Sequence, residues 1–187
     1  DGSAVVLNGE IHILGSATID NYTKHYKFDG SSWASVGTLP YDFYQGSAVV
    51  FDNEIHILGG NDNSTKHYKF DGTTWASVST LPYGFAAGSA VVFYDNIYIL
   101  GSKSGNKSHY KWNGSSWTKV STLPYAFYYG SAVVFNNGIY LLGSGNSNYS
   151  TNHYLIMGYV PVYTFLDYVV SDKETAYPDG GEKGGYW

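Results

Sequence analysis

The strongest constraint on the fold of this chain is a phrase that its sequence repeats four times. Gly-Ser-Ala-Val-Val begins at Gly2, Gly46, Gly88 and Gly130, so the period is 42 to 44 residues. A period of this length is typical of β-propellers, in which each repeat is one four-stranded blade. A second phrase, Lys-His-Tyr-Lys-Phe-Asp-Gly-Ser-Ser-Trp, occupies residues 24–33 and returns with small changes at 66–75 and 108–117. The chain is therefore expected to build one structural unit four times.

Each repeat predicts four short strands, which in the second copy are residues 48–51, 54–58, 66–70 and 75–78. Two-residue hairpins need positive φ and favour Asn, Asp or Gly. Such pairs stand between the first and second strands at Asn8-Gly9, Asp52-Asn53, Asp95-Asn96 and Asn136-Asn137, and between the third and fourth at Asp29-Gly30, Asp71-Gly72 and Asn113-Gly114. No stretch has the 3.6-residue periodicity of a long amphipathic helix. We predict an all-β protein whose sheets are apolar on both faces.

The spacing of glycine and aromatic residues in the repeats resembles that of the kelch family. The second copy has Gly59-Gly60, then Tyr68, then Trp75, and the other copies have Gly-Ser at 15, 101 and 143. Over residues 1–158 the resemblance implies kelch-type β-propeller blades of about 42 residues. The fourth repeat is incomplete, because Tyr154 is present but Pro161 stands where the tryptophan is expected.

Closure of the ring stays open at this stage, because kelch propellers usually have six or seven blades. The four repeats either close as a small ring or form an arc that needs more chain, or a homo-oligomer that completes the propeller, to protect its edges. The chain starts at Asp1, inside a repeat, so we expect it to be a piece of something larger.

Residues 159–187 lie outside the repeats and predict a strand followed by a glycine-rich turn. The amino-acid sequence of 169–181 and 185–187 resembles a segment of tail-associated proteins of phages that infect gut Firmicutes. The kelch-like repeats of residues 1–158 also resemble parts of those proteins. The resemblance implies an extracellular or virion-surface location.

The composition disfavours several classes of partner. Charged residues make up 13% of the chain, all ten basic residues are lysine, and the net charge is −5, which disfavours nucleic acid and anionic membrane. No apolar run approaches the roughly 20 residues that span a bilayer, so no membrane insertion is expected. Aromatic residues reach 18%, with 20 tyrosines, a balance that suits contact with neutral carbohydrate.

No residue pattern predicts catalysis, a metal site or a cofactor. Four of the six histidines, His25, His67, His109 and His153, occupy one repeat position and so belong to four different blades, which favours stacking over metal binding. Trp33, Trp75 and Trp117 recur once per blade, which favours packing between blades. A kelch enzyme of the galactose-oxidase kind would need a cysteine, and a sialate-handling one an arginine, and the chain has neither.

The loops between blades divide into a repeated part and a variable part. They begin Leu-Pro-Tyr at Leu39, Leu81 and Leu123, and their phenylalanines recur, so these residues are interpreted as scaffold. In kelch propellers the loops between blades emerge on the same face as the loops between the second and third strands, which here are 16–23, 61–65, 102–107 and 144–151. The polar and aromatic mixture of these loops suits recognition. The predicted ligand-binding residues are the variable ones: Asp42, Tyr44, Gln45, Asn61, Tyr128 and Tyr129.

The sequence thus favours a non-catalytic binding module whose partner is a glycan or a cell-surface receptor. A structural spacer of a tail fibre is the main alternative, and a kelch protein-docking adaptor or a kelch-fold enzyme are the others.

Overall fold

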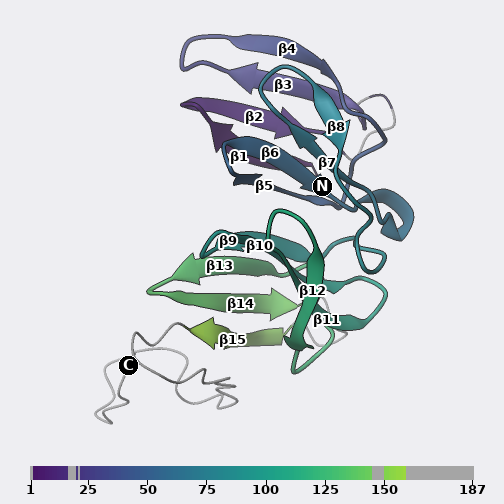
Figure 1. Cartoon of the computed structure of the whole chain (residues 1–187), viewed down its shortest axis with the longest axis vertical. Coiled ribbons are helices and arrows are strands. Elements are labelled where there is room, and N and C mark those ends of the chain that lie inside the picture. The colour runs from purple at the N-terminus through teal and green to yellow at the C-terminus, as the bar shows by residue number, and fades with distance from the viewer. Residues whose placement is uncertain (1, 17–19, 21, 145–149, 159–187) are drawn as a thin grey trace.

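The protein is an all-β propeller of four blades (Figure 1). The computed structural model describes residues 2–16, 20, 22–144 and 150–158. The first blade contains β1 (Ser3–Leu7), β2 (Glu10–Leu14), β3 (Lys24–Phe28) and β4 (Trp33–Thr38); the second β5 (Ser47–Phe51), β6 (Glu54–Leu58), β7 (His67–Phe70) and β8 (Trp75–Ser77); the third β9 (Ser89–Phe93), β10 (Asn96–Ser102), β11 (Asn106–Trp112) and β12 (Trp117–Thr122); and the fourth β13 (Ser131–Phe135), β14 (Gly138–Ser144) and β15 (Ser150–Gly158).

Every blade is an antiparallel meander in which strands pair in chain order. The first strands of consecutive blades contact one another, β1 with β5, β5 with β9 and β9 with β13, so they form the inner wall of the propeller. A 3₁₀ turn, η2 (Asn61–Asn63), lies between the second and third strands of the second blade. The described residues contain no helix that is long and apolar enough to cross a membrane. The predicted strand and turn of residues 159–187 lie outside the described residues.

The hairpins between first and second strands have the expected positive φ, as at Asn8 (53°) and Gly9 (81°). The prediction was wrong by one residue in the third blade. There the turn is Tyr94-Asp95, and Asn96 is already the first residue of β10, paired with Phe93. Tyr94 has the positive φ that Asn8, Asp52 and Asn136 have in the other blades, and its carbonyl oxygen accepts a hydrogen bond from the Asn96 side chain.

The connections between third and fourth strands are four-residue loops, not the predicted two-residue hairpins. In the first blade Asp29 Oδ1 accepts hydrogen bonds from the backbone N–H groups of Ser31 and Ser32, both at 2.8 Å. Asp71 and Asn113 repeat this arrangement in the second and third blades. The acidic or amide side chain is therefore selected for its acceptor oxygen, and only the glycine after it needs positive φ.

Blades pack through apolar side chains on both faces of each inner sheet. Three buried clusters join the first blade to the second, the second to the third, and the third to the fourth. In the first of these clusters Leu7 and Leu14 of one blade meet Ile55 and Ile57 of the next. The prediction of sheets that are buried on both faces is confirmed for the interior blades.

In the second and third blades, the glycine at the end of the second strand, Gly59 or Gly101, is held between two inter-blade loops. A Cβ on Gly59 would lie 2.0 Å from the Phe85 carbonyl oxygen of the following loop, and Gly59 has a φ of +64°. The Tyr41 hydroxyl of the preceding loop donates to the Gly59 carbonyl oxygen at 2.6 Å. Burial raises the pKa of Tyr41, so this hydroxyl stays a donor. Phe43, Phe85 and Phe127 are fully buried, which confirms the repeated loop residues as scaffold.

Among the described residues, a neighbouring blade covers only one face of the first blade and only one face of the fourth. None of the buried clusters of the described residues joins the fourth blade to the first. Trp33 is 53% exposed, whereas its equivalents Trp75 and Trp117 pack against the neighbouring blade. Of the two alternatives for closure, the structure therefore favours the open arc.

Replacing Trp75 by Ala is expected to lower the free energy of unfolding by about 3 kcal/mol, because the indole fills space between two blades. Its ring centroid lies 5.1 Å from that of Phe70 and 5.6 Å from that of His25 in the preceding blade. Trp33→Ala is the matched control and should cost less than about 1 kcal/mol, because its face is uncovered. Urea denaturation measures both, and equal losses would contradict the assignment of Trp75 to interface packing.

Candidate functional site

The variable loops lie together on one face of the propeller, as the sequence predicts. Phe43 N–H donates to the Tyr22 carbonyl oxygen at 2.9 Å, and Phe85 N–H donates to that of Ser64 at 3.1 Å. Each bond joins a loop that connects two blades to the loop between the second and third strands of the blade that precedes it. We call this surface, formed by loops 39–46, 61–65, 81–88, 102–107 and 123–130 together with Tyr22, the loop face.

A hollow of about 220 Å³ opens on the loop face where the inner strands begin. Gln45, Ala87 and Tyr129 occupy one repeat position around it, with φ values of 57°, 54° and 53°. Their backbones are linked, because Ala87 N–H donates to the Gln45 carbonyl oxygen at 2.6 Å and Tyr129 N–H donates to that of Ala87 at 2.7 Å. The lining is completed by Gly2, Gly46, Gly88 and Gly130.

This repeat position holds non-glycine residues in left-handed backbone conformations. That region is uncommon for such residues and is retained where the surrounding structure imposes it. This backbone conformation places the side chains of Gln45, Ala87 and Tyr129 beside the hollow. Because the Ala87 side chain is small, it leaves space between the other two. The glycines that follow keep the floor free of side chains.

A polar chain crosses the hollow. Lys103 Nζ donates to Gln45 Oε1 at 3.0 Å, and Gln45 Nε2 donates to the Tyr129 hydroxyl at 3.2 Å. Tyr129 is 60% exposed, and its ring meets that of Tyr128 edge to face at 5.7 Å. The arrangement therefore presents an ammonium group, an amide and an aromatic ring to solvent within one small area.

The remaining candidates lie around this cluster. Tyr44 stacks on Tyr22, with ring centroids 4.9 Å apart and an angle of 22° between planes. Asn61 begins η2, and its Oδ1 is buried without a hydrogen-bond partner. Gly60, the neighbour of Asn61, approaches the Tyr44 backbone so closely that a Cβ would lie 3.2 Å from its carbonyl oxygen. The structure thus links Tyr44, Gln45, Asn61, Tyr128 and Tyr129 into one region, whereas the Asp42 side chain is exposed to solvent.

Two side chains of this region were not among the predicted site residues. Lys103 and Tyr22 both belong to the loops between second and third strands that the sequence singles out as variable. The variable composition of these loops could have indicated both residues. Nothing in the sequence shows that Lys103 reaches Gln45, 58 residues away.

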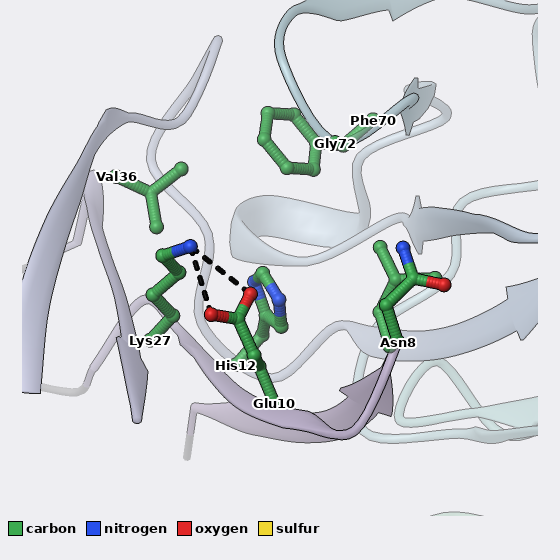
Figure 2. A pocket seen from close by; sticks show the side chains of 8 residues that line it. Asn8, Glu10, His12, Lys27, Val36, Phe70 and Gly72 are labelled. Atoms are coloured by element: carbon green, nitrogen blue, oxygen red, sulfur yellow. Dashed lines mark hydrogen bonds and ion pairs between the residues drawn. The ribbon is translucent and has the colours of Figure 1, made fainter. Parts of the chain in front are cut away.

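A second, smaller cavity of about 130 Å³ lies between the first two blades (Figure 2). Its lining includes the turn residues Asn8 and Gly72, which belong to the hairpins opposite the loop face. Lys27 Nζ donates to both carboxylate oxygens of Glu10, at 2.9 and 3.0 Å, beside His12. The second blade repeats the pair as Lys69 and Glu54, so this ion pair is a property of the repeat.

The buried histidines form pairs inside blades. His12 Nδ1 lies 2.8 Å from His25 Nε2, and His56 Nδ1 lies 2.8 Å from His67 Nε2. One ring of each pair must donate and the other accept, so at least the accepting ring is neutral. In the third blade Tyr98 replaces the first histidine, and His109 Nδ1 instead contacts Ser121 Oγ at 2.9 Å. His25, His67 and His109 therefore have structural partners, which agrees with the prediction of stacking for these three residues.

Comparison with known proteins identifies the fold and no family. No protein-family model and no curated protein matches the chain. A solved structure titled "Structure of YjhT" is similar, with a TM-score of 0.70 and 14% sequence identity. The match covers 82% of this chain and 67% of that chain. The likeness supports the propeller architecture.

Acid is expected to destabilise the protein through these histidines. Burial lowers the pKa of His25, His56 and His109 to about 4 and that of His67 to about 3. Between pH 6.5 and about 4 the unfolded chain therefore binds protons that the folded chain does not, and the free energy of unfolding falls as pH falls. Each such histidine contributes up to about 1.4 kcal/mol per pH unit.

Urea denaturation at pH 7 and at pH 5 measures this effect. His56→Tyr, which copies the residue found at the equivalent position of the third blade, should reduce the dependence on pH. A stability that is unchanged between pH 7 and pH 5 would contradict the prediction.

Proposed function

We propose that this protein is a non-catalytic binding module that recognises neutral glycans on a cell surface through its loop face. The observation that carries the proposal is the exposed Tyr129 ring beside the Gln45 amide and the Lys103 ammonium group, at the rim of the axial hollow. In keeping with the resemblance of its sequence to kelch-like repeats of phage tail proteins, we place it outside the cell or on a virion.

The chemistry of these groups suits a sugar better than an anion. An aromatic ring offers a flat apolar face with a polar tip, which matches a sugar ring that has apolar C–H faces and hydroxyl edges. Gln45 can donate and accept, so it can serve hydroxyl groups of either orientation. Lys103 provides a donor beside Gln45 without creating the arginine cluster that grips phosphate or carboxylate groups.

A site of this kind should bind weakly. Stacking contributes about 1 kcal/mol per ring, and each net hydrogen bond contributes a similar amount. Several such contacts give dissociation constants in the millimolar to high micromolar range. Useful attachment would then require many copies on one particle, where linked sites raise avidity about a hundredfold or more.

The test is a glycan array probed with a multimerised form of the protein. Tyr128→Ala combined with Tyr129→Ala should reduce retention at least about tenfold, and Gln45→Ala should reduce it by a smaller factor. Tyr94→Ala is the matched control, because Tyr94 is also an exposed tyrosine but belongs to a turn on the opposite face.

Retention that ignores the Tyr128 and Tyr129 substitutions, or no retention of any glycan, would refute glycan recognition by this face. The module would then fit the alternative of a structural spacer in a tail fibre.

A further inference from the structure

The cavity of about 130 Å³ between the first two blades is lined by two side chains that are smaller than their equivalents at the next interface. Leu7 and Phe70 line it, whereas Phe51 and Trp112 occupy the same repeat positions between the second and third blades. Trp112 is 3% exposed, so the repeat accommodates the larger ring there. A cavity of about 150 Å³ can hold one benzene molecule, so the space at the first interface suits a ligand of about five non-hydrogen atoms.

His12 brings a buried polar group to this cavity. Its side chain is 3% exposed and lines the cavity, and its Nδ1 atom lies 2.8 Å from Nε2 of His25. Burial lowers the pKa of both rings, so both are neutral at pH 7 and each carries one N–H group. The hydrogen bond to His25 uses Nδ1 and leaves Nε2 for the cavity. In the second blade the same atom of His56 is buried without a hydrogen-bond partner.

The surroundings of His25 decide which nitrogen of His12 carries the proton. Nδ1 of His25 is buried without a hydrogen-bond partner. A buried N–H group that lacks an acceptor is rare in proteins, whereas an unused acceptor is tolerated more often. His25 therefore carries its proton on Nε2 and donates a hydrogen bond to His12 Nδ1. The proton of the neutral His12 ring is then on Nε2, which makes that atom a donor at the cavity wall.

The cavity also offers acceptors and an apolar wall. The Glu10 carboxylate accepts hydrogen bonds from Lys27 at 2.9 and 3.0 Å, and each of its oxygens can accept a second one. The side chains of Lys27 and Glu10 are 39% and 30% exposed, so this end of the cavity reaches solvent. Figure 2 shows Glu10 beside His12, with the apolar side chains of Val36 and Phe70 across the cavity from them.

We propose that this cavity binds an acetamido group, in which a carbonyl joins a methyl group to an N–H group, and that the rest of the ligand extends into solvent past Glu10 and Lys27. The carbonyl oxygen accepts a hydrogen bond from Nε2 of His12. The amide N–H donates to the Glu10 carboxylate, and the methyl group packs against Val36 and Phe70. The cavity borders the hairpins opposite the loop face, so this site is separate from the one proposed for glycans.

Other classes of small ligand fit these groups less well. An anion would find no net positive charge, because Glu10 already neutralises the Lys27 ammonium group. A purely apolar ligand would displace water from the His12 donor and leave it unpaired, which costs free energy in a buried site. A neutral amide uses the donor, the acceptors and the apolar wall together.

The test is a titration of the isotope-labelled complete chain with N-methylacetamide, followed by NMR. Resonances of residues around the cavity should shift and saturate, with a dissociation constant of about 1 to 100 mM for so small a ligand. Methyl acetate keeps the carbonyl and methyl groups but has no N–H group, so it should bind about tenfold more weakly. Shifts that never saturate would show that the cavity holds water only, and tighter binding of acetate than of the amide would show an anion site; either result overturns the proposal.

A variant that fills the cavity tests its location. Leu7→Phe with Phe70→Trp introduces the side chains that the next interface already accommodates, so this variant should fold and should lose the saturable shifts. Phe28→Trp is the matched control, because it makes the same replacement at the equivalent position of the first blade, which does not line the cavity. Binding that persists in the filled variant would place the amide elsewhere and overturn the proposal.

The ring nitrogens of His12 test the donor directly and need no substitution. Their NMR shifts at pH 7 should show the proton on Nε2, and N-methylacetamide should shift Nε2 more than Nδ1. A proton on Nδ1 would remove the donor from the cavity wall and overturn the proposal, even if the filled variant failed to fold.

Discussion

The structure depends on the close contact between the glycine that ends each second strand and the loops that connect neighbouring blades. Gly59 receives a hydrogen bond from Tyr41 of the preceding loop and contacts the Phe85 carbonyl oxygen of the following loop. Any side chain at this position would overlap that oxygen. The contact positions the second and third blades relative to both neighbours, and it explains why glycine, tyrosine and phenylalanine recur at fixed spacing while residues between them change.

The same short loops serve packing and the candidate site through alternate residues. Phe43 is buried beneath the loop face, whereas Tyr44 stacks on Tyr22 and Gln45 borders the axial hollow. Because the glycine contact and the buried phenylalanine hold the loop, the neighbouring side chains can differ between blades without loss of the fold. This division of roles gives a rigid scaffold with an adaptable surface, which is common where recognition is carried by loops.

A propeller blade cannot bury both its faces alone, so the ends of a repeat array are its exposed apolar surfaces. Here the burial of Ile57 and the exposure of Ile13 arise from one sequence pattern in two positions along the chain. The histidine pairs are also buried by the neighbouring blade. His25 of the first blade, for example, packs against Phe70 and Trp75 of the second. Stability and acid sensitivity therefore have a common origin in the stacking of blades.

The sequence by itself determined the repeat, the strands, the position of most turns and the scaffold role of the loop phenylalanines, because these follow from local backbone preferences and apolar patterning. It placed the third-blade turn one residue late, since Asn96 has a turn propensity that its pairing with Phe93 overrides. Only the tertiary structure brought Gln45 to Tyr129, 84 residues away, and Lys103 to Gln45. The stacking of blades decides those contacts and the exposure of Ile13 and Phe135, because distance around a propeller axis is set by packing between repeats and not by any pattern within one repeat.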